Sequence, residues 1–97
     1  MLDKSDVLSY LKEFKKNNAK KYYIDKIGIF GSLARDEASS DSDIDIVVDM
    51  IKPNLLTLST IREEIMRYFK KDVDIVALWD KMNPRLKKRI EKEAIYV

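Results

Sequence analysis

The sequence predicts a small α/β (α+β) domain in which a mixed β-sheet is flanked by helices. Three observations support this: the chain has 97 residues, 45% of them are hydrophobic, and strand-like apolar runs alternate with segments of helical periodicity. A compact domain commonly takes about 100 to 150 residues, so we expect one domain over residues 1–97. The predicted order of elements is α-β-α-β-α-β-α, an alternation that packs helices against a sheet.

The first predicted element is an amphipathic helix over residues 4–17. Val7, Leu11 and Phe14 recur at helical spacing and would form its buried face. The asparagines at its end, the second of them Asn18, are expected to stop it. The helix therefore precedes the first strand.

A strand, a glycine turn and a short helix follow. The run Lys26–Phe30 is rich in β-branched and aromatic residues and halts at Gly31, and Leu33–Ala38 is predicted to be a short helix. A polar, serine-rich loop then leads into Ile44–Val48, which is strongly β-prone and gives the second strand.

The second half of the chain supplies two helices around a third strand. Apolar residues spaced three or four apart predict a helix over residues 55–69 with Asn54 as its cap. The third strand is Val73–Leu78. Asn83 before a proline is a cap-and-first-turn signature, so residues 84–93 are predicted to form a basic helix.

Composition excludes several classes of chemistry. The chain has no Cys and no His, which removes disulfides, thiolate nucleophiles, imidazole bases and Cys/His zinc sites. The net charge of +2 does not indicate any class of binding partner. The charges are unevenly distributed, however, because residues 36–49 carry only acidic charges and residues 81–92 are mainly basic. No apolar run reaches the ~18 residues of a membrane span, so a cytoplasmic protein is expected.

The most informative pattern is Gly31-Ser32 followed, after ten residues, by Asp43-Ile44-Asp45. Side chains alternate across a strand, so Asp43 and Asp45 are expected on one face with Cα atoms roughly 6.5 to 7 Å apart. Carboxylates so close repel each other unless a cation neutralises them, and hard oxygen ligands suit Mg²⁺ or Mn²⁺. The pair therefore predicts a divalent metal site.

A third carboxylate is expected from the third strand. Asp74 leads that strand as Asp45 does the second, and pairing of the two strands would bring it to the site, although Asp72 is an alternative for this role. Three carboxylates could hold two metal ions, which activate the attacking hydroxyl and stabilise the leaving oxygen in phosphoryl transfer.

The Gly31-Ser32 turn supplies the second component of such a site. A residue without a side chain permits close backbone approach, and amides at a helix N-terminus present donors to phosphate oxygens. Arg35, one turn later, could reach a phosphate as a fixed cation. A triphosphate would then lie between the turn and the metals.

The segment GSLARDEASSDSDID resembles the signature of the minimal nucleotidyltransferases, a branch of the DNA polymerase β-like nucleotidyltransferase superfamily. The later DVDIVAL resembles the family's third-carboxylate strand, and the ending EAIYV resembles its usual finish. One departure is Asp36, where many members have Gly, and its charge is expected to weaken or reshape nucleotide binding.

The resemblance implies a nucleotidyltransferase fold and transfer of AMP from ATP to a hydroxyl, with release of pyrophosphate. It implies that Asp43 and Asp45 hold two Mg²⁺ ions, that Asp74 ligates the metal nearer the acceptor and helps to deprotonate it, and that the Gly31-Ser32 turn holds the terminal phosphates. Stand-alone members often pair with a HEPN ribonuclease toxin and adenylylate its tyrosine, which nominates a protein acceptor and an antitoxin role.

Other functions stay open from the sequence. The chain could be a non-catalytic antitoxin that neutralises a partner by contact, or it could transfer nucleotides to RNA or a small molecule. The basic helix over residues 84–93 is more simply a solvated face than a nucleic-acid contact. Association with further copies of the chain is not decided by the sequence.

Overall fold

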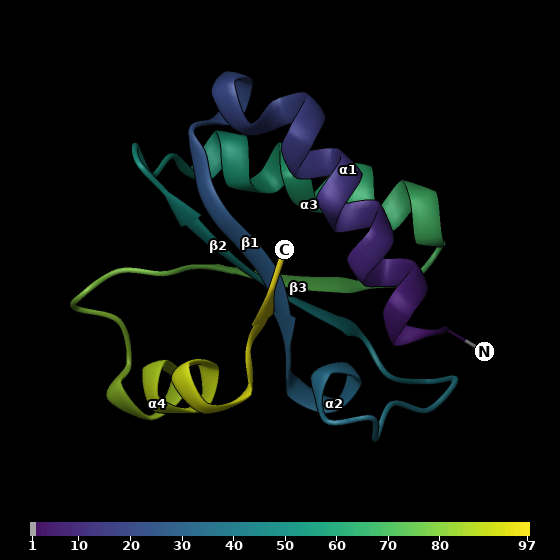
Figure 1. Ribbon diagram of the computed structural model, residues 1–97. Coiled ribbons are helices and arrows are strands. Elements are labelled where there is room, and N and C mark those ends of the chain that lie inside the picture. Colours follow the sequence, from purple (N-terminus) through teal and green to yellow (C-terminus); the bar gives the residue numbers. More distant parts are fainter. Residues whose placement is uncertain (1) are drawn as a thin grey trace.

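The fold consists of four helices and four strands, seen in a computed structural model that describes residues 2–97 (Figure 1). In chain order these are α1 (Lys4–Tyr22), β1 (Ile24–Phe30), α2 (Gly31–Ala34), β2 (Ile44–Met50), α3 (Leu55–Phe69), β3 (Val73–Ala77), α4 (Pro84–Glu93) and β4 (Ile95–Tyr96). The strands form one mixed sheet in the order β3-β2-β1-β4. The predicted class and the alternation of its first seven elements are confirmed.

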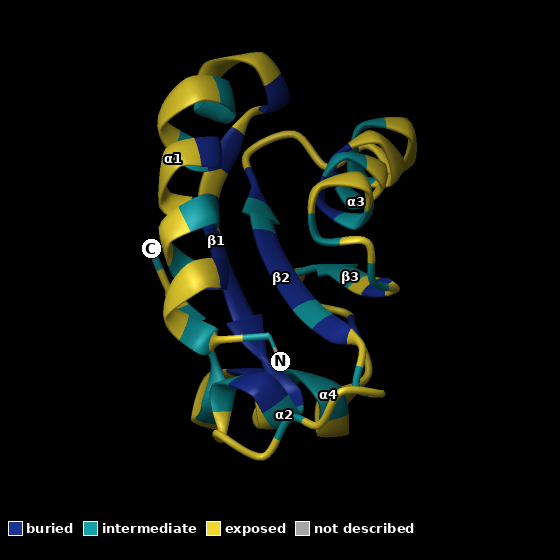
Figure 2. Cartoon of the chain, turned by 90° about the vertical axis from the view of Figure 1, so that its right-hand side faces the viewer, coloured by how far each residue is buried: buried dark blue, intermediate teal, exposed yellow. Residues whose placement is uncertain are grey.

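Two layers of helices enclose this sheet. Helices α1 and α3 cover one face and α4 lies at the other, while the short α2 lies beside α4 at the end of β1 with its Leu33 buried in the α1/α3 core (Figure 1). The α1/α3 face holds the larger core, which includes the fully buried Ile27, Ile46 and Ile61. The α4 face holds a smaller cluster around Phe30 and Ile90. Buried residues therefore run along the central strands, and exposed ones follow the outer helix surfaces (Figure 2).

The alternation of side chains along β2 separates core from site. Ile44, Ile46 and Val48 are fully buried and belong to the α1/α3 core, whereas Val47 belongs to the α4 cluster. Since strand side chains alternate, Asp45 lies on the same face as Val47. Strand β2 therefore turns Asp45 and Val47 toward α4, and Ile44, Ile46 and Val48 toward α1 and α3.

Five elements differ in their bounds from the expectation, among them β3, which ends at Ala77, one residue earlier than predicted. Helix α1 runs on to Tyr22 because the Asn18 side chain bonds back to the Phe14 carbonyl at 3.0 Å and because Tyr22 is buried in the core. Helix α2 begins at Gly31, earlier than predicted, and ends at Ala34. Strands β1 and β2 are each two residues longer than predicted, because they pair with each other along most of their length.

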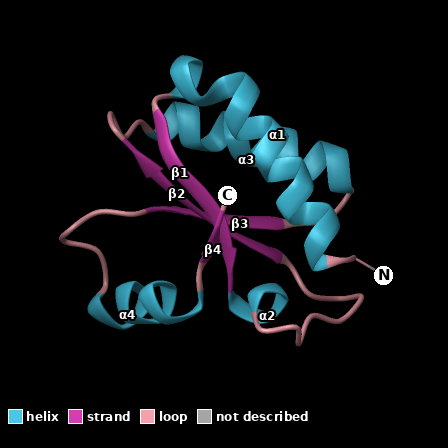
Figure 3. Ribbon diagram, in the orientation of Figure 1, coloured by secondary structure: helices cyan, strands magenta, loops and turns pink. Residues whose placement is uncertain are grey.

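The short strand β4 was not predicted. It pairs antiparallel with β1, Gly28 opposite Tyr96 and Ile29 opposite Ile95. Gly28 permits this approach, because a Cβ at that position would overlap the Ile95 carbonyl. Two residues give no detectable periodicity, so the strand depends on a contact between distant parts of the chain. Figure 3 shows it directly after α4.

Within the described residues, no helix has the length and apolarity needed to cross a membrane.

Candidate active site

Strand register places two of the predicted acidic residues side by side. Strands β2 and β3 are parallel, and Asp45 is the direct partner of Asp74. On its other side Asp45 faces Phe30, the last residue of β1. Asp45 therefore lies between Asp74 and the start of the Gly31 turn. This register favours Asp74 over Asp72 as the acid next to Asp45.

Asp43 is held less firmly. It lies one residue before β2, is exposed, and contributes to a pocket of about 470 Å³ that also includes Asp72 and Lys71. The backbone is fixed beside it, where the Ile44 N–H donates to the Asp72 carbonyl at 3.0 Å. Strand pairing therefore fixes the backbone beside Asp43 at the start of β2, but it does not set the direction of the Asp43 side chain.

The electrostatics of Asp45 are those of a crowded carboxylate. Partial burial raises its pKa, and the charges of Asp74 and Asp43 raise it further, while Arg89 and Arg35 oppose the shift. Ionised Asp45 is thus destabilised by its surroundings, and a bound cation would relieve this. The candidate metal ligands are all carboxylate oxygens, the ligand type that Mg²⁺ and Mn²⁺ prefer.

The residues nevertheless do not form a ready-made metal cage. Among residues 2–97, no three acidic side chains are gathered closely enough to hold one metal ion. Like charges repel when no cation separates them, which gives a physical reason for this spacing. The fold brings together Asp45 and Asp74, and coordination by all three carboxylates stays a prediction.

The Gly31 turn is fitted closely to the acidic residues. Gly31 has φ +72°, in the left-handed region that favours glycine. A Cβ at this position would also overlap the Asp45 carboxylate. Both the conformation and the contact therefore require glycine, and the turn lies directly against the predicted metal ligand.

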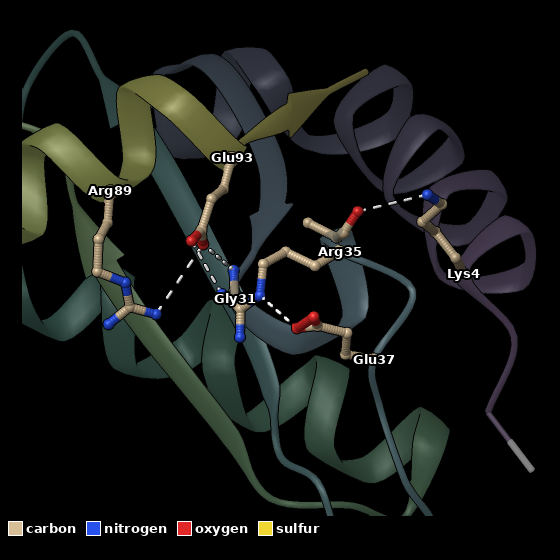
Figure 4. A network of polar contacts seen from close by, with 7 residues as sticks. Lys4, Gly31, Arg35, Glu37, Arg89 and Glu93 are labelled. Atoms are coloured by element: carbon tan, nitrogen blue, oxygen red, sulfur yellow. Dashed lines mark hydrogen bonds and ion pairs between the residues drawn. The ribbon is translucent and has the colours of Figure 1, made fainter.

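A carboxylate from α4 occupies the amide of this turn. The Gly31 N–H donates to Glu93 Oε2 at 3.1 Å, and Arg35 Nη1 donates to Glu93 Oε1 at 2.9 Å. Arg35 Nε also donates to Glu37 at 2.7 Å, so two carboxylates share this guanidinium (Figure 4). Partial burial acts to raise the pKa of Glu93, but the bonds from Arg35 and Gly31 outweigh it and lower the pKa.

Glu93 and Arg89 were not predicted as site residues from the sequence. Arg89 Nη2 lies 3.9 Å from Glu93 Oε2, the oxygen that Gly31 also contacts. Residues near the end of the chain reach the turn because α4 packs against α2. The only signal was that Glu93 opens the family-like ending EAIYV, which assigns no role. Ser32, by contrast, has no hydroxyl hydrogen bond within the described part of the chain, so its oxygen is available to a ligand.

Comparison with known proteins identifies the family. Residues 11–97 match the model of the nucleotidyltransferase domain. This chain belongs to the nucleotidyltransferase domain family. A protein of Methanocaldococcus jannaschii that carries the name of a protein adenylyltransferase is 36% identical over 94 residues, which is 96% of each chain. The protein adenylyltransferase MntA of Thermococcus cleftensis is 33% identical over 98 residues, covering 100% of this nucleotidyltransferase and 98% of the relative.

Solved structures support the same fold. A minimal nucleotidyltransferase structure superposes with a TM-score of 0.73 at 28% identity, covering 97% of this nucleotidyltransferase and 95% of that chain. A toxin-antitoxin structure with AMP-PNP gives a TM-score of 0.75 at 19% identity, over 98% of this chain and 72% of the other. The second likeness is evidence of fold alone.

Asp36, the departure from the family pattern, is explained by backbone geometry. Its φ is +60°, a conformation that glycine adopts readily and aspartate tolerates better than most residues. The carboxylate forms an ion pair with Lys4 of α1 at 3.0 Å. Its charge is therefore partly neutralised by Lys4. The ion pair weighs against a strong effect of Asp36 on the nucleotide, and the expectation that its charge weakens or reshapes nucleotide binding stays a prediction.

We predict that Asp36→Gly changes the KM for ATP less than about twofold, the range of ordinary surface substitutions. Relief of the left-handed strain is offset by loss of the exposed pair with Lys4 and by the entropy of glycine, so stability should stay within about 1 kcal/mol. Asp36→Ala should destabilise the protein more than Asp36→Gly in thermal unfolding. A marked fall in the KM of Asp36→Gly would show that the carboxylate does act on the nucleotide.

Proposed function

We propose that this nucleotidyltransferase transfers AMP from ATP to a tyrosine hydroxyl of a partner HEPN-type toxin, and thereby acts as a cytoplasmic antitoxin. The observation that carries the proposal is the direct pairing of Asp45 with Asp74 against the Gly31 turn. Its full-length relatives named as protein adenylyltransferases support a protein acceptor. A structural relative from Shewanella oneidensis is described as an MNT antitoxin in complex with its tri-AMPylated HEPN toxin.

Each residue of the site would have a separate role in AMP transfer. The acceptor oxygen attacks the α-phosphorus, the bond from that phosphorus to the bridging oxygen of the β-phosphate breaks, and pyrophosphate leaves. Asp74 is exposed beside Asp45, so an incoming hydroxyl can approach it and give up its proton there. Ser32 and Arg35 would hold the terminal phosphates. Two Mg²⁺ ions, when held by Asp43, Asp45 and Asp74, would supply charge neutralisation for the triphosphate and the acceptor.

An apolar groove next to Asp74 supports a protein acceptor. Its volume is about 590 Å³, and it follows the free edge of β3 between α3 and α4. Its lining includes Leu55, which is 83% exposed, and Trp79, which is 54% exposed. Val76, two residues after Asp74 and on the same face of β3, also contributes. Contiguous apolar surface of this kind marks interaction sites, so we propose that the acceptor protein docks here.

Two neighbouring leucines test this docking surface. Leu55→Ser should weaken binding of the acceptor protein about tenfold or more, as expected for an interface anchor, with the KM for ATP unchanged. Leu56→Ser is the matched control, because Leu56 is 80% exposed but does not line the groove. The affinity of each variant for the acceptor protein is measured by calorimetry. Equal effects of the two substitutions would refute the placement of the docking surface.

The activity itself is tested with ATP labelled on the α-phosphate. The chain is incubated with Mg²⁺ and a HEPN toxin encoded beside it, and mass spectrometry locates the label. We expect AMP on tyrosine with one pyrophosphate released per AMP, and none on a partner whose acceptor tyrosine is replaced by phenylalanine. Neutralisation of the toxin without label would instead indicate a non-catalytic antitoxin. Label on RNA or on a small molecule would identify a different acceptor.

A further inference from the structure

The charge balance of the site leaves a problem for nucleotide binding. Asp43, Asp45 and Asp74 present negative charge where a triphosphate, itself strongly negative, must bind. Arg35, the cation that the sequence nominates, is already engaged by Glu37 at 2.7 Å and by Glu93 at 2.9 Å. These bonds hold the pKa of Arg35 above its ordinary value and use two of its donor groups. Beyond the Mg²⁺ ions that the carboxylates would hold, a freer side-chain cation would strengthen binding of the triphosphate.

Arg89 of α4 meets that need. It contacts Glu93 Oε2 only loosely, at 3.9 Å, and its side chain is 53% exposed. It donates no side-chain hydrogen bond within residues 2–97, so its donors are available. Through the shared Glu93 Oε2, Arg89 therefore lies beside the Gly31 turn, which itself lies directly against the Asp45 carboxylate (Figure 4).

Given the proposed function, we propose that Arg89 is a nucleotide-binding residue that contacts the triphosphate. Glu93 is then the positioning residue that holds Arg89 and Arg35 on the same side of the Gly31 turn. Glu93 suits this role because its two oxygens face different guanidiniums and its side chain is only 14% exposed. The carboxylate between them offsets the repulsion between the two cations. A planar guanidinium can then bind phosphate oxygens through paired N–H groups.

The competing interpretation treats Arg89 and Glu93 as an ordinary pair four residues apart on a helix surface. Such pairs contribute about 0.3–0.5 kcal/mol to stability and have no effect on ligand binding. Arg85 separates the two interpretations. It is an exposed arginine one turn earlier on α4, and its side chain makes no hydrogen bond or ion pair within residues 2–97. Arg85→Gln and Arg89→Gln remove the same charge from the same helix.

The test measures ATP binding by calorimetry and the KM and kcat of AMP transfer for both variants. Arg89→Gln is expected to weaken ATP binding and raise the KM about ten- to a hundredfold, the range for a charge-assisted hydrogen bond, while Arg85→Gln stays within about twofold of the parent chain. Arg89→Lys should restore part of the affinity, since it returns the charge without the planar fork. Equal ATP affinity of Arg89→Gln and Arg85→Gln would overturn the proposal.

The role of Glu93 is tested in the same assay. Glu93→Gln should raise the KM for ATP, and less so when Arg89 is already glutamine, because the two residues act through one contact. A lower KM in Glu93→Gln would overturn the positioning role by showing that the carboxylate competes with phosphate. Failure of the proposed function is seen separately, as a parent chain that binds ATP yet transfers no AMP to the partner.

Discussion

Replacing Asp43 and Asp45 together by asparagine is expected to lower AMP transfer at least about 1,000-fold, the loss that corresponds to several kcal/mol of transition-state stabilisation by bound metal. Asparagine keeps the size of each side chain but removes the charge that would hold Mg²⁺. The rate is measured with α-labelled ATP and the acceptor protein. ATP binding in the presence of Mg²⁺ should weaken as well.

The thermal stability of this double variant separates loss of the site from loss of the fold. Ionised Asp45 is partly buried and is repelled by Asp74 and Asp43. Removing that charge should therefore leave the melting temperature, measured without divalent metal, unchanged or higher. Asp41→Asn is the matched control, as an exposed acid in the preceding loop, and should keep full activity. Undiminished transfer by the double variant would eliminate the assigned site.

Gly31→Ala is expected to lower AMP transfer at least about 100-fold and to destabilise the protein by about 2 kcal/mol or more. Alanine at φ +72° is strained, and its methyl group would overlap the Asp45 carboxylate. Either the turn or Asp45 must move. Both displacements separate the turn that we propose to bind phosphate from the acid that faces Asp74, so activity should fall more than the loss of stability alone would cause.

Gly28→Ala provides the control for that experiment. Its methyl group would overlap the Ile95 carbonyl of β4 rather than an acidic side chain. This substitution should cost comparable stability in urea unfolding, yet transfer per folded molecule should be nearly normal at a temperature where the variant is folded. If Gly28→Ala lost as much activity as Gly31→Ala, the effect of Gly31 would be general destabilisation and not a fitted contact with Asp45.

Local patterns predicted most of the fold correctly. Helix α3 was predicted with its observed bounds because its apolar spacing and the Asn54 cap agree, and the cap bonds to the Leu56 and Thr57 amides are present. The errors lie where long-range contacts override local signals. Asn18 was expected to end α1, but burial of Tyr22 continues the helix, and β4 exists only because β1 pairs with it.

The sequence by itself determined the residue types and the spacing from Gly31 to Asp45, because a glycine turn and two strand-end acids are local features of the chain. Tertiary structure alone decided which groups meet. Parallel pairing sets Asp74, rather than Asp72, opposite Asp45, and the packing of α4 brings Glu93 and Arg89 to a turn more than 50 residues earlier. Spacing along the chain carries no information on such contacts, since they depend on strand register and helix packing.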